Sequence, residues 1–221
     1  MALSPEAARR RIADARVYLV LTRKLCRLDP VAALRSALAG GVDVVQVREP
    51  GATGRELVAW ARVVRQLTKD AGVPLIINDR PDVARIVGAE GVHVGQDDVG
   101  PRDIRSFLGP DAIVGLSTHD VAQIVAARKE PVDYVGLGPC FDTATKGLQG
   151  LGMTLVADAA RRAADAGLPC FAIGGVDAVR AAELKAAGLG QVAVSSAVCS
   201  AADPGAAVVL LRDAISGRRP G

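Results

Sequence analysis

Aromatic residues are scarce in this chain: tryptophan, tyrosine and phenylalanine together make up 3% of its 221 residues. The hydrophobic residues, 50% of the total, are therefore mostly valine, leucine, isoleucine and alanine. This composition favours a buried parallel sheet covered by alanine-rich helices over a core of stacked rings. The length is sufficient for one large hydrophobic core.

Features that would indicate several other classes of protein are also missing. No apolar stretch reaches the length of a membrane span, and the N-terminal segment lacks the apolar core of a signal peptide. The formal net charge of +3 is too small to predict nucleic-acid binding, and no basic stripe with interleaved aromatics is present. We therefore expect a protein that binds neither membranes nor nucleic acid, and whose sequence permits a homo-oligomer without specifying one.

Cysteine and histidine are too few or too dispersed for the common soft-metal sites. The four cysteines, at positions 26, 140, 170 and 199, include no Cys-x-x-Cys pair, so neither a zinc site nor a redox dithiol is expected. The presence of only two histidines excludes a multi-histidine metal site. We expect buried free thiols in a reducing compartment, and therefore a cytoplasmic protein.

Eight short apolar runs alternate with amphipathic, alanine-rich segments, which we expect to be strands and helices respectively. The expected strands are 17–22, 42–48, 74–78, 91–95, 112–117, 132–138, 169–174 and 191–195, and the clearest helices are 29–39, 54–71, 120–129, 154–166 and 177–187. A spacing of about 25 residues from strand to strand is typical of an α/β fold of the (β/α)8 TIM-barrel type. An open doubly wound sheet is the alternative, but no Gly-x-Gly-x-x-Gly fingerprint follows the first strand.

One barrel domain with short additions at its ends is the expected organisation. Residues 2–16 should form a preliminary helix, because Ser4 can cap it, Pro5 suits its first position and Glu6 complements its dipole. No linker rich in proline or serine interrupts the later repeats. We therefore assign 1–16 to an N-terminal helical extension, 17–215 to the catalytic barrel and 216–221 to a flexible tail.

Two acidic loops are the strongest indication of chemistry. Asn78-Asp79 and Gln96-Asp97-Asp98 each follow an apolar run, and about twenty residues separate them, the length of one strand–helix–strand step. Carboxylates at the same ends of neighbouring parallel strands would converge, and converging oxygens can hold Mg²⁺ together with a phosphorylated substrate. Spacing alone leaves Asp97 and Asp98 as alternatives, and it leaves open that the aspartates only cap the following helices.

Other polar residues also follow strands, where barrel enzymes place their active sites. Arg48 and Lys146 could supply positive charge to a phosphate group. The loops after the last two strands contain Gly174-Gly175 and Ser195-Ser196, which suit phosphate binding. The structural alternative is a tight turn followed by a helix cap.

The two histidines lead to different expectations. His93 lies within an expected strand, so we expect it to be a hydrogen-bonded core histidine. His119 follows a strand and could cap a helix, ligate a metal or transfer a proton. Glu49 is either an acid–base group or a loop charge.

Taken in order along the chain, the strand-end segments resemble those of the thiamine-phosphate synthase family over about residues 17–215. Each segment is a weak signal alone, but the complete series is specific. The segments are Val45-Gln46-Val47-Arg48-Glu49, Ile77-Asn78-Asp79-Arg80, Gly91-Val92-His93-Val94-Gly95-Gln96-Asp97-Asp98, Gly115-Leu116-Ser117-Thr118-His119, Asp133-Tyr134-Val135-Gly136-Leu137-Gly138-Pro139, Thr143-Ala144-Thr145-Lys146, Ala172-Ile173-Gly174-Gly175 and Val192-Ala193-Val194-Ser195-Ser196.

This resemblance implies a transferase of thiamine biosynthesis that uses Mg²⁺ and joins an aminopyrimidine diphosphate to a thiazole phosphate or its carboxylated form. Diphosphate leaves first, and the thiazole nitrogen captures the resulting pyrimidine methylene cation. The implied catalytic residues are Arg48, Lys146 and Ser117. The implied ligands are Asp79 and Asp98 for Mg²⁺, Arg48, Asn78 and Lys146 for diphosphate, Gln46 and Ser117 for the pyrimidine, and Thr143, Thr145, Gly175, Ser195 and Ser196 for the thiazole phosphate.

Two positions depart from the family pattern. Pro50 stands where the family usually has a lysine that reaches the diphosphate, so one cation is lost. The segment after Lys146 is short and resembles that of the thiazole tautomerases, a sister family in which a histidine at the place of His119 moves a proton. Those proteins generally lack the acidic pair that this chain keeps, so a synthase is favoured. The alternatives are a tautomerase and a catalytically weak barrel that binds the precursors.

Overall fold

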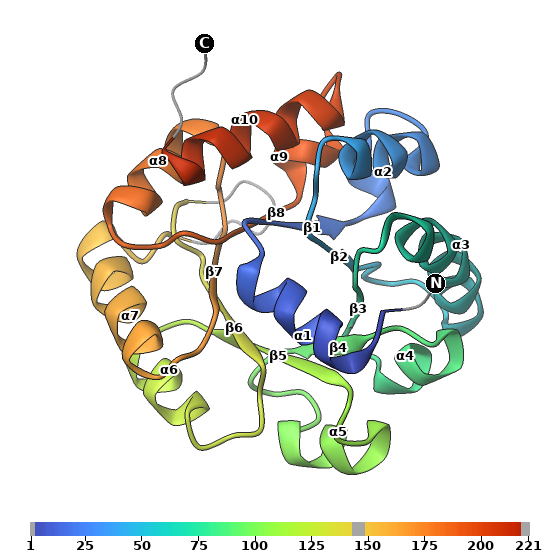
Figure 1. Ribbon diagram of the computed structural model, residues 1–221, viewed down its shortest axis with the longest axis horizontal. Helices are drawn as coiled ribbons and strands as arrows, with labels where there is room; N and C mark the ends of the chain where they lie inside the picture. Colours follow the sequence, from blue (N-terminus) through green and yellow to red (C-terminus); the bar gives the residue numbers. More distant parts are fainter. Residues whose placement is uncertain (1–2, 143–148, 218–221) are drawn as a thin grey trace.

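Eight parallel strands close into a barrel in the computed structural model, which describes residues 3–142 and 149–217 (Figure 1). Each strand pairs with the next along the chain, and the last one returns to the first through Val17 and Val192. The predicted (β/α)8 barrel is confirmed and the open sheet is wrong. The strands are β1 (Val17–Leu21), β2 (Val44–Val47), β3 (Leu75–Asn78), β4 (Gly91–Val94), β5 (Ile113–Thr118), β6 (Tyr134–Leu137), β7 (Cys170–Ile173) and β8 (Val192–Val194).

Helices surround the ring of strands, as Figure 1 shows, and the five helices named from the sequence are all among them. Among the described residues, no helix is both long and apolar enough to cross a membrane. The helices are α1 (Pro5–Asp14), α2 (Pro30–Ala39), α3 (Gly54–Ala71), α4 (Pro81–Val87), α5 (Pro101–Leu108), α6 (Val121–Ala127), α7 (Met153–Asp165), α8 (Ala178–Ala186), α9 (Ser196–Cys199) and α10 (Pro204–Ser216), with a short 3-10 helix η1 (Arg23–Leu25).

Helix α3 shows how the sequence specifies these elements. Thr53 and Glu56 form a reciprocal capping box at its start, and Gly72 ends it in the left-handed conformation with φ of 65°. Its buried residues include Leu57, Trp60, Ala61 and Val64, which recur at helical spacing and face the barrel. Local signals and hydrophobic pattern therefore agree.

Helix α1 closes the end of the barrel at which the strands begin. Ser4 caps the helix as predicted, and the helix buries its own residues Ala8 and Ile12 against the barrel. Gln191, directly before β8, donates to the Ile12 carbonyl, while Arg9 pairs with Asp133 directly before β6 at 3.2 Å. In Figure 1, α1 lies across the middle of the ring. Only the opposite end, where the strands finish, remains for a site.

The hydrophobic core has two layers, because alternate residues of a strand face opposite sides of the sheet. One layer lies between the strands and the outer helices. The other fills the barrel interior, to which Ala8 and Ile12 of α1 and Ala15, directly after that helix, contribute. The strand residues of this interior layer are Tyr18, Val20, Val44, Ile76, Ile113, Tyr134, Phe171 and Ala193.

The contact between α1 and the interior layer leads to a stability prediction. Ile12 is 1% exposed, so Ile12→Ala should open a cavity and lower the free energy of unfolding by about 2–4 kcal/mol. Ile86 on α4 is 55% exposed, and Ile86→Ala removes the same atoms at an expected cost below about 1 kcal/mol. Urea unfolding of both variants measures the difference. Equal losses would show that α1 does not seal the barrel.

Candidate active site

Every second residue of each strand faces the barrel interior, so each strand has a row of inward-facing residues that ends at the open end of the barrel. On β2 the row is Val44, Gln46 and then Arg48, directly beyond the strand. The register aligns Asn78 with His93 across β3 and β4. Ser117, near the end of β5, hydrogen-bonds to His93. The barrel therefore brings together residues that one or more helices separate along the sequence.

The two acidic loops meet at this open end. Partial burial and then the neighbouring Asp98 carboxylate raise the pKa of Asp79, while the positive charge of Arg48 opposes the increase. Asn78 donates to Asp79 Oδ2 at 2.6 Å, and the Gly95 amide donates to Asp98 Oδ2 at 2.7 Å. The predicted convergence of Asp79 and Asp98 is therefore present in the fold, with Arg48 close enough to influence it.

Helix capping does not explain these aspartates. The residue before α4 is Arg80, which makes no side-chain cap, and Gly100 holds the same position before α5. Asp79 instead has φ of 59°, a left-handed conformation that few residues other than glycine adopt. The capping alternative raised from the sequence is wrong for Asp79 and Asp98, since both carboxylates are held at the mouth of the barrel.

The acidic pair fits a magnesium ion that also binds substrate. Burial is the largest cause of the raised pKa of Asp79, and repulsion by the Asp98 carboxylate is the next; a cation between the two carboxylates would offset both costs. Within the described ranges no three histidine, cysteine, aspartate or glutamate side chains cluster as a complete metal site. Mg²⁺ commonly uses one or two carboxylates, completing its shell with water and substrate phosphates.

Two charged residues that directly follow the proposed site residues Arg48 and Asp79, namely Glu49 and Arg80, are paired with other side chains. Glu49 accepts from the Arg23 amide at 2.8 Å and lies 3.3 Å from the Arg23 guanidinium, so it is a structural partner of η1. Arg80 makes two hydrogen bonds to Asp82, at 2.8 and 2.6 Å. Arg23 and Arg80 are thus both held by carboxylates, and neither is a free cation that could substitute for the lysine that the family resemblance implies at position 50.

Both histidines have defined partners. His93 contacts Tyr134 through Nδ1 at 3.1 Å and Ser117 through Nε2 at 2.9 Å, which confirms the expected hydrogen bonds, and the residue as a whole is half-buried. Burial, with a further contribution from Arg48, lowers the pKa of His93 to about 4. His119 donates from Nδ1 to the Gly138 carbonyl at 2.6 Å, and Asp120 rather than His119 caps α6.

The loops after β7 and β8 have features that suit a phosphate. Gly174 and Gly175 have φ of 97° and 66°, and a Cβ on Gly175 would lie 2.7 Å from the Asp142 carbonyl. Glycine is therefore required here for both conformation and space. Ser195 precedes α9 without capping it, and its buried hydroxyl has no hydrogen-bond partner among the described residues. Ser196 is the first residue of α9.

Three predicted site residues, Thr143, Thr145 and Lys146, lie outside the described residues. Two residues that sequence reasoning did not assign to the site, Tyr18 and Tyr134, lie directly beneath it with their hydroxyls 2.9 Å apart. The available signal was the scarcity of tyrosine: the chain has only two, and both lie within expected strands.

Comparison with known proteins agrees with this geometry. Residues 17–198 match the family described as thiamine monophosphate synthase. The chain belongs to the thiamine monophosphate synthase family.

Curated relatives within the thiamine monophosphate synthase family are similar over most of their length. The thiamine-phosphate synthase of Azorhizobium caulinodans is 46% identical over 191 residues, covering 86% of this chain and 90% of the relative. That of Laribacter hongkongensis is 42% identical, covering 89% of this chain and 93% of the relative. These matches extend beyond the strand-end motifs to the scaffold.

Solved structures show the same relationship. Thiamine phosphate pyrophosphorylase from Pyrococcus furiosus has a TM-score of 0.82 at 29% identity, covering 94% of this chain and 98% of that one. A structure of 3-hexulose-6-phosphate synthase has a TM-score of 0.60 at 17% identity, which shows a shared fold alone.

The low pKa of His93 predicts a specific dependence of stability on pH. The ordinary value is 6.5 and the folded value about 4, so at intermediate pH the unfolded chain binds a proton that the folded protein does not. Stability should therefore fall as the pH drops through this range. Between about pH 7 and about pH 5, in EDTA, the loss should be about 2 kcal/mol larger than in His93→Gln. Urea unfolding at both pH values measures it, and equal losses would contradict a neutral His93.

Proposed function

We propose that this chain is a thiamine-phosphate synthase, a transferase that joins an aminopyrimidine diphosphate to a thiazole phosphate and releases diphosphate. The observation that carries the proposal is the acidic pair Asp79 and Asp98 beside Arg48 at the mouth of the barrel. Curated relatives carrying the name thiamine-phosphate synthase, at 46% and 42% identity, support it. A barrel that served only as a scaffold would have no need of like charges held together at its open end.

Asp79 and Asp98 are the proposed ligands of Mg²⁺, and Asn78 holds Asp79 in place through its amide. When bound, the metal supplies positive charge that neutralises the diphosphate as it leaves. Arg48 adds a second charge with the fork geometry that suits phosphate oxygens. Lys146 is proposed to add a third. The reaction therefore depends on stabilising a leaving group at a fixed place.

The bond changes need little acid–base chemistry. The carbon–oxygen bond to diphosphate breaks with both electrons leaving on oxygen, and the methylene carbon of the pyrimidine becomes electron-deficient. The lone pair of the thiazole nitrogen then forms the new carbon–nitrogen bond. Gln46 and Ser117 are proposed to hold the pyrimidine so that this carbon faces the thiazole, since orientation lowers the barrier. No proton has to move in either step.

The thiazole phosphate is proposed to bind at the far side of the mouth. Gly175 and the Ser195-Ser196 pair follow β7 and β8, and the unpartnered Ser195 hydroxyl supports an anion there. Thr143 and Thr145 are proposed to contribute hydroxyl donors. The thiazole phosphate would then bind on the side of the ring opposite β3 and β4, the strands that the acidic pair follows.

A reducing compartment is the proposed setting of this reaction. The cysteines Cys26, Cys140, Cys170 and Cys199 are all free thiols, and three of them are buried. Burial raises the pKa of Cys140 and Cys170 to about 12, which makes both thiols poor nucleophiles. Free, unreactive cysteines are usual in cytoplasmic enzymes.

Two neighbouring aspartates provide a matched test of the metal site. Asp98→Asn should slow diphosphate release at least about a hundredfold, because one proposed ligand and half of the acidic pair are lost. Asp97→Asn removes the same charge one position away and should change the rate less than about threefold. The assay uses both substrates with Mg²⁺ and measures diphosphate. Similar rates for the two variants would refute Asp98 as a ligand.

Metal removal distinguishes the synthase from a tautomerase. EDTA should abolish diphosphate release and added Mg²⁺ should restore it, whereas His119→Asn should reduce the rate less than about tenfold, below the contribution of a general acid or base. A tautomerase would instead move a proton on the carboxylated thiazole phosphate in EDTA and lose this activity in His119→Asn. That second pattern would overturn the proposed function.

A further inference from the structure

A continuous chain of hydrogen bonds crosses the barrel interior between two of the proposed pyrimidine contacts. Gln46 Nε2 donates to the Tyr18 hydroxyl at 2.8 Å, and the Tyr18 and Tyr134 hydroxyls are 2.9 Å apart. Tyr134 lies 3.1 Å from His93 Nδ1, and His93 Nε2 lies 2.9 Å from the Ser117 hydroxyl. We call this set of five residues the interior relay.

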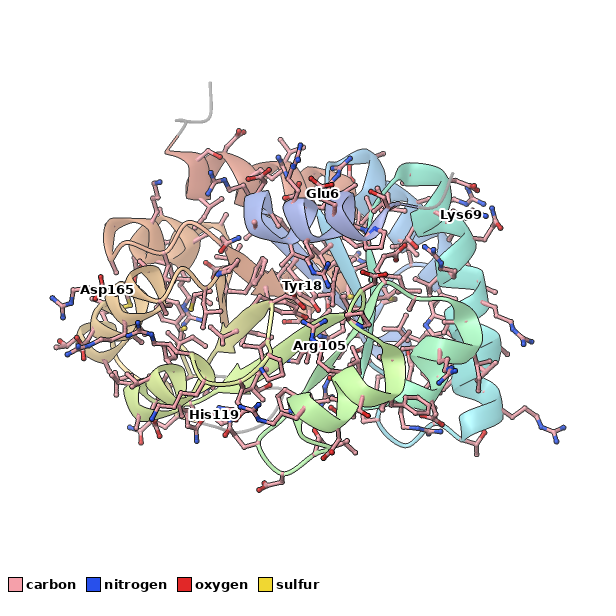
Figure 2. The ribbon with its side chains drawn as sticks, turned by 60° about the horizontal axis from the view of Figure 1, so that its bottom comes forward. Glu6, Tyr18, Lys69, Arg105, His119 and Asp165 are labelled. Carbon is pink, nitrogen blue, oxygen red and sulfur yellow. The ribbon has the colours of Figure 1, made fainter. Side chains whose placement is uncertain are left out.

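The interior relay lies between the closed and the open ends of the barrel. Figure 2 shows Glu6 of α1 and His119, which follows β5, toward opposite ends, with Tyr18 between them. Phe171 packs edge-on against Tyr18 and Tyr134 at 5.2 and 5.5 Å between ring centroids. A Cβ on Gly115 would overlap both Tyr134 and His93. The rings are therefore held in place by close packing.

Every member of the interior relay is neutral. Within the described residues, no carboxylate or cationic side chain hydrogen-bonds to a side chain of the relay, and both ring nitrogens of His93 contact hydroxyl groups. Burial raises the pKa of Tyr18 and of Tyr134 well above their ordinary value. Each tyrosine hydroxyl consequently has one proton to donate. The imidazole ring carries one proton, on either of its two nitrogens.

The amide of Gln46 gives the interior relay a direction. An amide nitrogen only donates, so the Tyr18 oxygen accepts from it. Tyr134 is the only other side-chain partner of the Tyr18 hydroxyl among the described residues, so the Tyr18 proton has an acceptor only if it is donated to Tyr134. Tyr134 then donates its own proton to His93 Nδ1, which must be bare. The proton of His93 therefore lies on Nε2 and is donated to the Ser117 oxygen.

At the two ends of the interior relay, one group can still accept a hydrogen bond and the other can still donate one. Oε1 of Gln46 can accept a hydrogen bond, and the hydroxyl proton of Ser117 can be donated. Gln96 donates to the Ser117 backbone carbonyl at 2.6 Å and leaves the hydroxyl free. Within residues 3–142 and 149–217, no further hydrogen bond occupies either group.

We propose that Tyr18, Tyr134 and His93 are positioning residues that fix this donor–acceptor polarity, so that the site accepts an aminopyrimidine and rejects the corresponding oxopyrimidine. The inference rests on the proposed function, which supplies the pyrimidine. An amino group donates and the ring nitrogens accept, which matches Gln46 and Ser117 as the relay leaves them. An oxopyrimidine presents an oxygen and a ring N–H instead. It would have to turn the Gln46 amide over and reverse every proton of the relay, or else leave buried polar groups unmatched, and either is costly.

Nitrogen NMR of the free protein tests the relay directly, and with two histidines in the sequence the spectrum is simple. At about pH 8, His93 should carry its proton on Nε2. His119 should carry its proton on Nδ1, because that atom donates to a carbonyl, and it serves as an internal reference. A His119→Gln variant assigns the signals. A proton on Nδ1 of His93, or exchange between the two forms, would overturn the proposal.

Reversal of the relay is the stronger test. In Gln46→Glu the carboxylate can only accept, so Tyr18, Tyr134 and His93 should each donate in the other direction and the His93 proton should move to Nδ1. Gln96→Glu makes the same exchange beside Ser117 but outside the relay, and should leave His93 unchanged. Tyr18→Phe cuts the connection, so adding Gln46→Glu to that variant should no longer move the proton. If the His93 proton stayed on Nε2 in Gln46→Glu, the relay would be refuted.

Selectivity supplies the functional readout. The unaltered enzyme should use the aminopyrimidine diphosphate at least about a hundredfold better than its oxo analogue, measured as kcat/KM for diphosphate release. Tyr18→Phe and Tyr134→Phe should reduce this ratio at least about tenfold while leaving KM for the thiazole phosphate unchanged. Equal selectivity in all three proteins would contradict a positioning role.

The two proposals fail in different ways. The tautomer of His93 is measured without substrates, so it does not depend on whether the protein makes thiamine phosphate. The expected tautomers without diphosphate release would refute the proposed function alone. Diphosphate release with the proton on Nδ1 of His93 would refute the relay alone.

Discussion

Closure of the parallel sheet is the constraint on which the rest of this structure depends. Because β8 pairs with β1, every second side chain of all eight strands points into one shared interior. The row on β2 shows the result: Val44 contributes to the apolar layer, Gln46 to the interior relay, and Arg48 to the mouth. Polarity therefore rises along the barrel axis. Three residues spaced two apart, on β2 and directly after it, therefore lie in an apolar layer, a neutral polar layer and the charged mouth.

Helix α1 closes one end of the barrel and thereby determines at which end the polar residues gather. Buried apolar residues and ion pairs such as Arg9–Asp133 occupy the end where the strands begin, so charged groups with a functional role collect at the other end. The open end carries a cost in stability, since Asp79 has a left-handed backbone and lies beside the carboxylate of Asp98. Folding alone does not favour such a pair. Its presence is therefore best explained by a ligand that brings positive charge.

Much of this could be predicted from the sequence, because it follows from local pattern. The eight apolar runs predicted the strands, and the ends of those strands predicted that Asp79 would lie close to Asp97 or Asp98. Only the family resemblance selected Asp98. Long-range geometry could not be predicted. Tyr18 and Tyr134 are 116 residues apart, and only the closed barrel brings their hydroxyls into contact. The pairing of Glu49 with Arg23, which removes Glu49 as a candidate acid, likewise depends on how η1 packs beside β2.

Arg48 connects the charged mouth with the neutral layer beneath it. Its positive charge opposes the rise in the pKa of Asp79 and also contributes to the low pKa of His93. The cation proposed to grip the diphosphate therefore also helps to keep an imidazolium from forming under the pyrimidine. In the proposed reaction the pyrimidine itself becomes positively charged, and a second cation directly beneath it would raise that barrier. The neutral groups of the interior relay would orient the pyrimidine ring without opposing the positive charge that develops on it. The division between charged residues at the rim and neutral residues below thus suits a reaction in which the leaving group needs neutralising and the remaining fragment needs only to be held.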